Sequence, residues 1–219
     1  SSRVGQRTGD YRLTELLGSG GMGDVYLAER AAGDFEQKVA IKLVRRDLVS
    51  PAVTRRFTEE RRILARLRHP SIAALFGGGL TDDGRPYLVM EYVDGVPLDR
   101  HCRERELPMG RRVQLVIAVC RAVAHAHAQR TVHCDLKPDN VLVTADGEVK
   151  LLDFGIATVL EGDDARPLTA MTPSYAAPEV LKGATASWAS DQFSLGVLLH
   201  ELAAGRHPFG EAEPLYPYV

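Results

Sequence analysis

The sequence predicts an α+β fold, with a small strand-rich part first and a larger helical part after it. Short segments rich in β-branched residues fill the first 93 residues, and 3.6-residue apolar periodicity dominates after residue 109. The stretch at 92–95 between them reads as a linker. A chain of 219 residues is long enough for two unlike lobes with a sizeable core and a cleft between them.

The first part contains five strand candidates, at 11–17, 24–30, 38–44, 72–76 and 87–92. The glycines at 18, 20, 21 and 23 lie between the first two candidates and predict a hairpin with a wide turn. A second glycine run at 77–79, together with Asp82-Asp83-Gly84, predicts the turn region before the last candidate.

A helix is expected over residues 51–67, with one carboxylate on its apolar face. Phe57, Glu60, Leu64 and Leu67 share that face. A carboxylate that is partly buried needs a cation as partner. Lys42, at the end of the strand candidate 38–44, is a candidate partner, although a lysine there could also simply be exposed.

The second part is mainly helical. The expected helix at 109–129 carries an apolar stripe wide enough to be buried, formed by Val113, Val116, Ile117, Cys120, Val123, Ala124 and His127. Short strands are expected at 141–144 and 149–152, on either side of a turn at 145–147. A long polar stretch over 158–175 precedes a final helix at 190–203.

Composition limits the partners and the cellular location. A net charge of −2 gives no reason to expect binding to nucleic acid or to an anionic membrane. Cys102, Cys120 and Cys134 are odd in number and lack metal-site spacing, which favours a reduced, cytoplasmic protein. No run approaches the roughly 18 apolar residues of a membrane span, and the start lacks the apolar stretch of a signal peptide.

The glycine-rich stretch 18–25, GSGGMGDV, allows backbone amides to approach phosphate oxygens because no Cβ stands in the way. By itself the pattern is at least as consistent with a flexible hairpin turn. A strand-forming segment follows it, whereas a dinucleotide fingerprint opens a helix, so that type of site is excluded.

The stretch 133–143, HCDLKPDNVLV, gathers polar groups just before a strand candidate. Asp135 offers a carboxylate that can orient and deprotonate a hydroxyl. Lys137 adds a positive charge, and Asn140 offers a hard oxygen ligand. Asp153, past the next strand, offers a second metal ligand. Each residue alone could belong to a turn or a cap, but their joint occurrence in this order is not expected by chance.

With these motifs in order, the sequence resembles a serine/threonine protein kinase of the eukaryotic-like bacterial kind. The resemblance runs from Tyr11 to about Gly210. It rests on the following segments and residues: GSGGMGDV at 18–25, VAIK at 39–42, Glu60, MEYV at 90–93, HCDLKPDN at 133–140, DFG at 153–155, APE at 177–179 and Asp191.

The resemblance implies a bilobal protein-kinase-like fold. Residues 1–93 would form an N-lobe, with a five-stranded antiparallel sheet, the Gly-rich loop and the C-helix, ending at the hinge. Residues 94–219 would form a C-lobe with the catalytic loop and the activation segment, lacking its last helices. An internal apolar column of Leu64, His133 and Phe154 would stand on Asp191.

The resemblance also implies site residues. Asp135, Lys137, Lys42 and Glu60 would be catalytic, and Asn140 and Asp153 would hold Mg²⁺, with Mn²⁺ as the alternative metal. ATP would bind to Leu17, Gly18, Ser19, Gly20, Gly21, Met22, Gly23, Val25, Ala40, Lys42, Met90, Glu91, Val93 and Leu142.

The implied reaction is transfer of the ATP γ-phosphoryl group to Ser or Thr hydroxyls of protein substrates, this chain included. Two alternatives stay open. One is a catalytically silent nucleotide-binding scaffold, or pseudokinase, because of the missing C-terminal helices. The other is a kinase for small molecules, which the Lys137-Pro138 pair and the segment ending at 177–179 make the weaker reading.

The sequence departs from the family pattern at two places. Cys134 stands where an arginine usually reads a phosphate on the activation segment, and a thiol cannot form that charged, bidentate contact. We therefore expect activity without phosphorylation of Thr169, the best candidate phosphosite, and we expect Thr172 to contact Asp135 and Lys137. The short C-lobe leaves Glu179 without its usual arginine and predicts self-association or marginal stability.

Overall fold

The computed structural model of the chain describes residues 3–31, 37–55, 57, 65–154 and 172–210. By its contacts the chain divides into two compact units. The first unit comprises Ser1–Arg68 and Ala73–Val93, and the second comprises His69–Ile72 and Asp94–Val219. The four residues 69–72 therefore belong to the second unit, although the chain on both sides of them belongs to the first.

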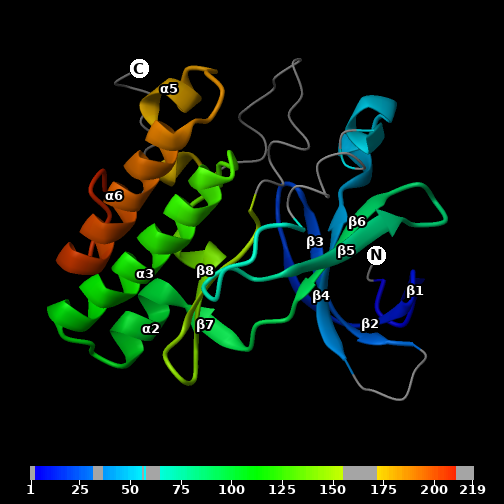
Figure 1. Cartoon of the computed structure of the whole chain (residues 1–219), viewed down its shortest axis with the longest axis horizontal. Coiled ribbons are helices and arrows are strands. Elements are labelled where there is room, and N and C mark those ends of the chain that lie inside the picture. Colours follow the sequence, from blue (N-terminus) through cyan, green and yellow to red (C-terminus); the bar gives the residue numbers. More distant parts are fainter. Residues whose placement is uncertain (1–2, 32–36, 56, 58–64, 155–171, 211–219) are drawn as a thin grey trace. The chain divides into compact units, whose positions relative to one another are not determined.

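The first unit is built on an antiparallel sheet of six strands in the order β1-β2-β3-β4-β6-β5 (Figure 1). The strands are β1 (Arg7–Thr8), β2 (Tyr11–Ser19), β3 (Gly23–Arg30), β4 (Lys38–Val44), β5 (Leu75–Leu80) and β6 (Pro86–Glu91). Five strands were expected. The sixth, β1, is a two-residue segment that pairs with the start of β2, too short to leave a periodic signal in the sequence.

The two glycine runs, each expected to form a turn, differ from that expectation in the structure. The run at 77–79 lies inside β5, so the expectation of a turn there is wrong, and the strand expected at 72–76 lies instead at Leu75–Leu80. A Cβ on Gly78 would stand 2.5 Å from the carbonyl oxygen of Tyr87, so glycine permits this close strand pairing. The first run forms a narrower turn than expected, because β2 continues to Ser19 and β3 begins at Gly23.

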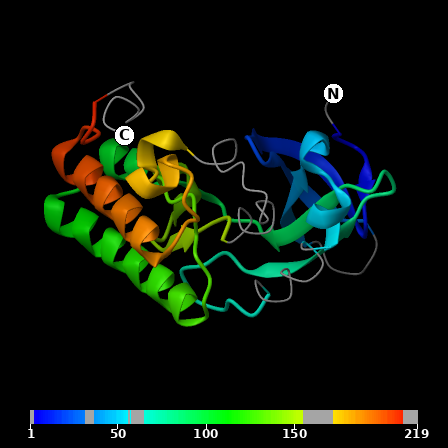
Figure 2. The ribbon, with the colours of Figure 1, turned by 90° about the horizontal axis from the view of Figure 1, so that it is seen from above.

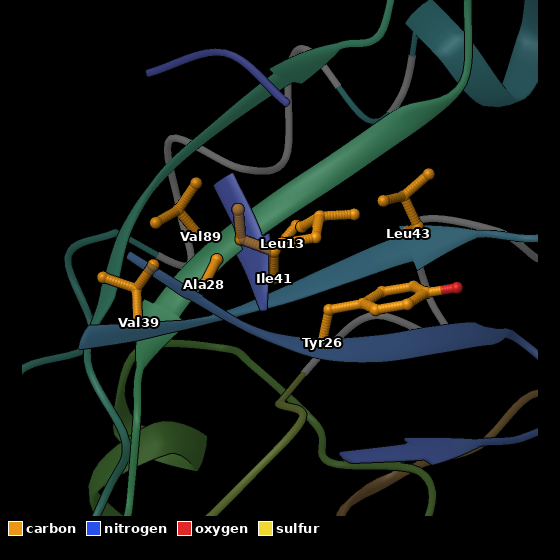
Figure 3. Packing of buried hydrophobic residues seen from close by; sticks show 7 residues of the cluster. All are labelled: Leu13, Tyr26, Ala28, Val39, Ile41, Leu43 and Val89. Carbon is orange, nitrogen blue, oxygen red and sulfur yellow. The ribbon is translucent and has the colours of Figure 1, made fainter. Parts of the chain in front are cut away.

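One face of the sheet carries the hydrophobic core of the first unit (Figure 3). The cluster consists of Leu13, Tyr26, Ala28, Val39, Ile41, Leu43 and Val89, all at most 5% exposed. In β4 these residues are the odd-numbered positions, as the two-residue period of a strand requires. Burial of each large apolar side chain contributes about 1.5–3 kcal/mol, so this face carries much of the unit's stability.

The helix expected over 51–67 is described in part. Residues 51–55 and 57 are helical, after a short 3₁₀ helix, η1 (Arg46–Leu48). Phe57 and Leu67, two members of the predicted apolar face, are both buried. The other two members, Glu60 and Leu64, lie outside the described residues.

The second unit combines a small sheet with helices. Its strands are β7 (Gly95–Pro97), β8 (Val141–Thr144) and β9 (Val149–Leu151), paired in that order. Its helices are α2 (Leu98–Glu104), α3 (Met109–Ala128), α5 (Pro178–Leu181) and α6 (Trp188–Ala204), with 3₁₀ turns η2 (Pro138–Asn140) and η3 (Pro173–Tyr175). The long helices α3 and α6 lie side by side (Figures 1 and 2).

The buried face of α3 differs from the predicted stripe. Val113, Ile117, Cys120 and Ala124 are exposed, which contradicts the expectation for these four positions. The residues that are buried are Val116, Val119, Ala122, Val123 and Ala126. The predicted stripe spans two adjacent helix faces, and the face that packs is the one toward α6 and β9.

Local chemistry sets both ends of α6. Ser187 and Ser190 form a reciprocal capping box, in which each hydroxyl oxygen accepts the other's backbone N–H. The helix therefore begins at Trp188, two residues before the predicted start. At the other end, Gly205 adopts a left-handed conformation with φ of 67° and terminates the helix. Arg112 of α3 also donates to the carbonyl oxygen of Leu202 at 2.8 Å.

No helix in the described part of the chain is both long enough and apolar enough to cross a lipid bilayer.

Two leucines of β2 provide a matched test of the core. Leu13→Ala should lower the free energy of unfolding by about 2–5 kcal/mol, because Leu13 is fully buried in the cluster. Leu16→Ala removes the same atoms from a side chain that is 43% exposed, and should cost under about 1 kcal/mol. Urea unfolding followed by circular dichroism measures both, and equal losses would contradict the assigned core face.

Candidate active site

The face of the first-unit sheet opposite the core gathers several candidate nucleotide-binding residues. In β4, Ala40 and Lys42 alternate with the core residues, and both are buried. Val25 of β3 pairs with Lys42, and Met90 of β6 pairs with Ala40. Directly paired residues of antiparallel strands share a face. The sheet register therefore places these four residues together.

The hairpin between β2 and β3 carries the glycine-rich stretch. Leu17, Gly18 and Ser19 end β2, and the amides of Gly20 and Gly23 each bond the other's carbonyl oxygen, at 2.9 and 3.3 Å. Gly21 and Met22 lie between them, and Met22 is buried. A Cβ on Gly23 would approach the oxygen of Leu43 to 2.0 Å, so β3 can lie this close to β4 with glycine alone.

The end of β6 is held by the side chain of Glu91. Its Oε2 accepts a hydrogen bond from the backbone amide of Ala74 at 3.0 Å, and its own amide donates to the Ala74 oxygen at 2.8 Å. The carboxylate of Glu91 thus holds the end of β6 to the backbone at Ala74. Val93, the last residue of the first unit, follows two positions later.

In the second unit, a buried aspartate anchors the segment that begins at His133. Asp191 of α6 is 1% exposed, and its two carboxylate oxygens accept the backbone amides of His133 and Cys134 at 2.8 and 3.0 Å. His127 of α3 completes the set, with its Nε2 2.8 Å from the carboxylate. Hydrogen bonds to a buried charge are among the strongest in proteins, so this group fixes the loop to two helices.

The imidazole of His133 has a defined tautomer. Its Nδ1 accepts the backbone amide of Asp135 at 3.3 Å, so Nε2 donates to the carbonyl oxygen of Leu152 at 2.7 Å. Burial lowers the pKa of His133 below its ordinary value, although the Asp191 carboxylate acts in the opposite direction. The neutral ring lies edge-on to Phe154, with 4.7 Å between centroids, and so connects the loop with the segment after β9.

Asp135, Lys137 and Thr172 form a compact polar cluster. The Lys137 ammonium lies 3.2 Å from the Asp135 carboxylate and donates to the Thr172 hydroxyl at 2.6 Å. The Thr172 amide donates to the other oxygen of Asp135 at 3.1 Å. Both charged side chains are largely but not fully buried, so a carboxylate and a cation are held in fixed positions while each keeps access to solvent.

The candidate metal ligands lie at the adjoining ends of β8 and β9. These strands pair antiparallel with Val141 opposite Leu151, so Asn140 and Leu152 adjoin. The backbone amide of Leu152 donates to the backbone carbonyl oxygen of Asn140 at 2.8 Å. Asp153 comes next, in a left-handed conformation with φ of 60°. Leu142 lies within β8 and is half-buried.

The Asn140 side chain is suited to a hard cation. Its amide nitrogen donates to the backbone oxygen of Asp135 at 2.7 Å and to the Asp135 carboxylate at 3.1 Å. This fixes the amide so that its oxygen faces away from Asp135. The described residues contain no group of three or more His, Cys, Asp or Glu side chains that could hold an ion. One amide and one carboxylate fit Mg²⁺, which keeps several waters and takes phosphate oxygens as further ligands.

Some residues with a role in this site were not predicted from the sequence. His127 counted as part of an apolar stripe, yet it binds Asp191. Tyr175 donates to Glu201 of α6, and nothing in the linear pattern joins these two positions. Among the predicted site residues, Glu60 and Thr169 lie outside the described part of the chain.

Comparison with known proteins gives consistent matches. A family model described as "Protein kinase domain" matches residues 11–216. The chain is 37% identical over 211 residues to the serine/threonine-protein kinase PrkC of Bacillus subtilis. The match covers 94% of this chain and 32% of that protein. It is 40% identical over 221 residues to the serine/threonine-protein kinase PknA of Mycobacterium tuberculosis, covering 95% and 50%. The chain therefore spans about a third to a half of the length of these relatives.

The fold is also similar to a solved structure. The crystal structure of the Mycobacterium tuberculosis PknI kinase domain superposes with a TM-score of 0.76 at 32% sequence identity. The match covers 98% of this chain and 83% of that one.

The role of Asp191 as an anchor can be tested by a nearly isosteric change. Asp191→Asn leaves one acceptor oxygen where three donors converge, and it removes the charge. The free energy of unfolding should fall by about 3 kcal/mol or more, because buried donors lose their partner. Asp139→Asn is the matched control, since Asp139 is exposed and lies in η2, beside the same loop. Chemical denaturation compares the two, and similar small losses would exclude the anchor role.

Proposed function

Because the chain belongs to the protein kinase family, we propose that it transfers the γ-phosphoryl group of ATP to serine or threonine hydroxyls of protein substrates, its own chain included. One observation carries the proposal beyond family membership: Asp135, Lys137 and Thr172 lie within hydrogen-bonding distance of one another, with Asn140 bonded to Asp135. A carboxylate, a cation and a metal-ligand amide are the groups that phosphoryl transfer requires.

The proposed lobes have the bounds expected from the sequence. Residues 1–93 are the N-lobe and residues 94–219 the C-lobe. In the N-lobe, the paired positions Val25, Ala40, Lys42 and Met90 support a nucleotide-binding face, since three are apolar and the fourth is a cation. Lys42 would hold ATP phosphates, with Glu60 as its proposed partner.

The remaining proposed ATP contacts come from other segments of the chain. The hairpin amides of residues 18–23 would approach the phosphates, where glycine allows close contact. Leu17 and Leu142 would contact the adenine ring, and the backbone of Glu91 and Val93 would bond its edge. Glu91 suits this role because its side chain is engaged with Ala74, which fixes the local backbone.

Protein kinases use ATP together with a divalent metal ion. For this chain we propose Mg²⁺, with Mn²⁺ as the alternative, held by Asn140 and Asp153. The bound ion neutralises negative charge on the phosphate oxygens. The fixed orientation of the Asn140 amide, set by two hydrogen bonds to Asp135, keeps its oxygen available for this purpose.

The proposed reaction is a single displacement at the γ-phosphorus. Asp135 accepts the proton of the substrate hydroxyl as the new O–P bond forms, and the bond to the leaving ADP oxygen breaks. Lys137 stabilises the negative charge on the transferring group. The Thr172 amide and the Lys137 ammonium bond the Asp135 carboxylate from two sides, and this fixes its position before substrate arrives.

We propose a cytoplasmic catalytic unit that acts on proteins and not on nucleic acid, consistent with its net charge of −2. Self-association through the C-lobe is the proposed assembly. Analytical ultracentrifugation tests it, and a monomer at all concentrations would exclude it.

The catalytic assignment predicts a loss of transfer without a loss of nucleotide binding. Asp135→Asn should lower kcat by about 10²–10⁴-fold, because the amide cannot accept the proton. Radiolabelled ATP, Mg²⁺ and a generic basic protein provide the assay, and fluorescent-nucleotide titration follows binding. Asp146→Asn, in an exposed turn, is the control and should keep full activity. Lys42→Ala should weaken nucleotide binding as well as transfer.

The alternatives give different outcomes in the same assay. Nucleotide binding without any label transfer by the wild-type chain would identify a silent scaffold. Label transfer to small metabolites and to no protein would identify a small-molecule kinase. Label that persists in Asp135→Asn would overturn the role of Asp135.

The cysteine at position 134 predicts activity independent of one phosphosite. Thr169→Ala and phosphatase-treated enzyme should both retain kcat within about threefold of phosphorylated enzyme, since a thiol cannot bind a phosphate as a guanidinium does. Mass spectrometry monitors phosphate occupancy at Thr169. Thr172→Ala is the contrasting variant and should lose activity, because it removes the hydroxyl that accepts a hydrogen bond from Lys137. A loss of several orders of magnitude in Thr169→Ala would refute the prediction.

A further inference from the structure

A histidine beyond the end of α6 carries an unexplained polar atom. In the described part of the chain, the Nε2 of His207 is the one buried side-chain nitrogen or oxygen without a hydrogen-bond partner. A buried donor that lacks an acceptor costs about 1–3 kcal/mol, so such an atom calls for a reason. A phenylalanine at this position would avoid that cost.

The orientation of the His207 ring is defined by its neighbours. Its Nδ1 accepts the backbone amide of Phe209 at 3.3 Å, so Nε2 carries a proton. The ring lies at 85° to the Tyr175 ring, with 5.3 Å between centroids, and tilted to Phe209 at 5.8 Å. An N–H can bond weakly to the electron-rich face of an aromatic ring, and edge-to-face pairs contribute about 0.5–1.5 kcal/mol.

Tyr175 is itself fixed at both ends. Its hydroxyl donates to the Glu201 carboxylate at 2.5 Å, and its backbone oxygen accepts the Ser194 hydroxyl at 2.8 Å. Burial raises the pKa of Tyr175 well above its ordinary value, and the hydrogen bond to Glu201 raises it further. The phenol therefore stays a neutral donor, and the ring presents a stable surface to His207.

From Tyr175 a short series of hydrogen bonds reaches the proposed catalytic base. The backbone amide of Tyr175 donates to the backbone carbonyl oxygen of Thr172 at 3.1 Å and closes the η3 turn. The Thr172 amide in turn donates to Asp135 at 3.1 Å, and Lys137 donates to the Thr172 hydroxyl at 2.6 Å. A displacement of Tyr175 that moved its backbone would therefore shift the η3 turn and, with it, the atoms that hold Asp135.

We propose that His207 is a positioning residue: its ring braces Tyr175, so that the η3 turn holds Thr172 against Asp135 and Lys137. Its effect passes through Tyr175, and it makes no contact with Asp135 among the bonds described. The catalytic consequence rests on the proposed kinase function, but the bracing itself does not.

Hydrogen–deuterium exchange followed by NMR tests the bracing without an activity assay. In His207→Ala the amides of Thr172 and Tyr175 should exchange about tenfold faster than in the wild type, while those of β4 in the first unit stay unchanged. His207→Phe restores an aromatic edge and should bring exchange back to within about threefold. Unchanged exchange in His207→Ala would overturn the proposal. Equal acceleration in β4 would also overturn it, because it indicates global destabilisation.

Steady-state kinetics then measures the consequence for transfer. His207→Ala should lower kcat about tenfold with the KM for ATP unchanged, and His207→Phe should recover most of it. Tyr175→Phe removes the hydroxyl alone, and the double variant His207→Ala/Tyr175→Phe should lose less than the product of the two single losses, since both changes release the same ring. Fully multiplicative losses would show that His207 acts independently of Tyr175. Accelerated exchange in His207→Ala, together with a wild type that transfers no phosphate, would reject the proposed function and leave the bracing intact.

Discussion

The arrangement of the second unit depends on one buried carboxylate. Asp191 lies on α6, and it accepts two consecutive backbone amides, at His133 and Cys134, together with the ring of His127 from α3. Removing a carboxylate from water is costly, and three donors offset that cost. Because the donors come from a loop and a second helix, the charge can be satisfied in one arrangement of all three segments. That arrangement places Asp135 one residue beyond the anchored amides.

In the first unit the equivalent constraint is the two-residue period of β4. The odd positions are buried in the core, so Ala40 and Lys42 must appear on the opposite face. The pairing register then brings Val25 and Met90 beside them. A register shift of one residue would exchange the two faces. The same packing that stabilises the sheet therefore also assembles the proposed nucleotide-binding face.

Much of this could be predicted from the sequence, and the failures have physical causes. Local signals are strong in β4 and in α3, whose predicted bounds are almost those observed. Packing is not local: apolar residues such as Ile117 and Val113 look like core, yet the face that meets α6 is the neighbouring one. Glycines predict a turn at 77–79, but in the structure they allow the neighbouring strand to pair closely there. Contacts across long separations, such as Tyr175 with Glu201, leave no signal in a single sequence.

The anchor also explains why a cysteine is tolerated at position 134. Asp191 binds the backbone amide there, and every residue except proline supplies that group. The left-handed conformation, with φ of 73°, costs about 1–2 kcal/mol for a residue with a Cβ. A hydrogen bond to a buried charge contributes about as much, so this bond offsets that cost without a contribution from a charged side chain. The conformation of the segment that contains the proposed catalytic Asp135 therefore does not require a phosphate-binding arginine at position 134.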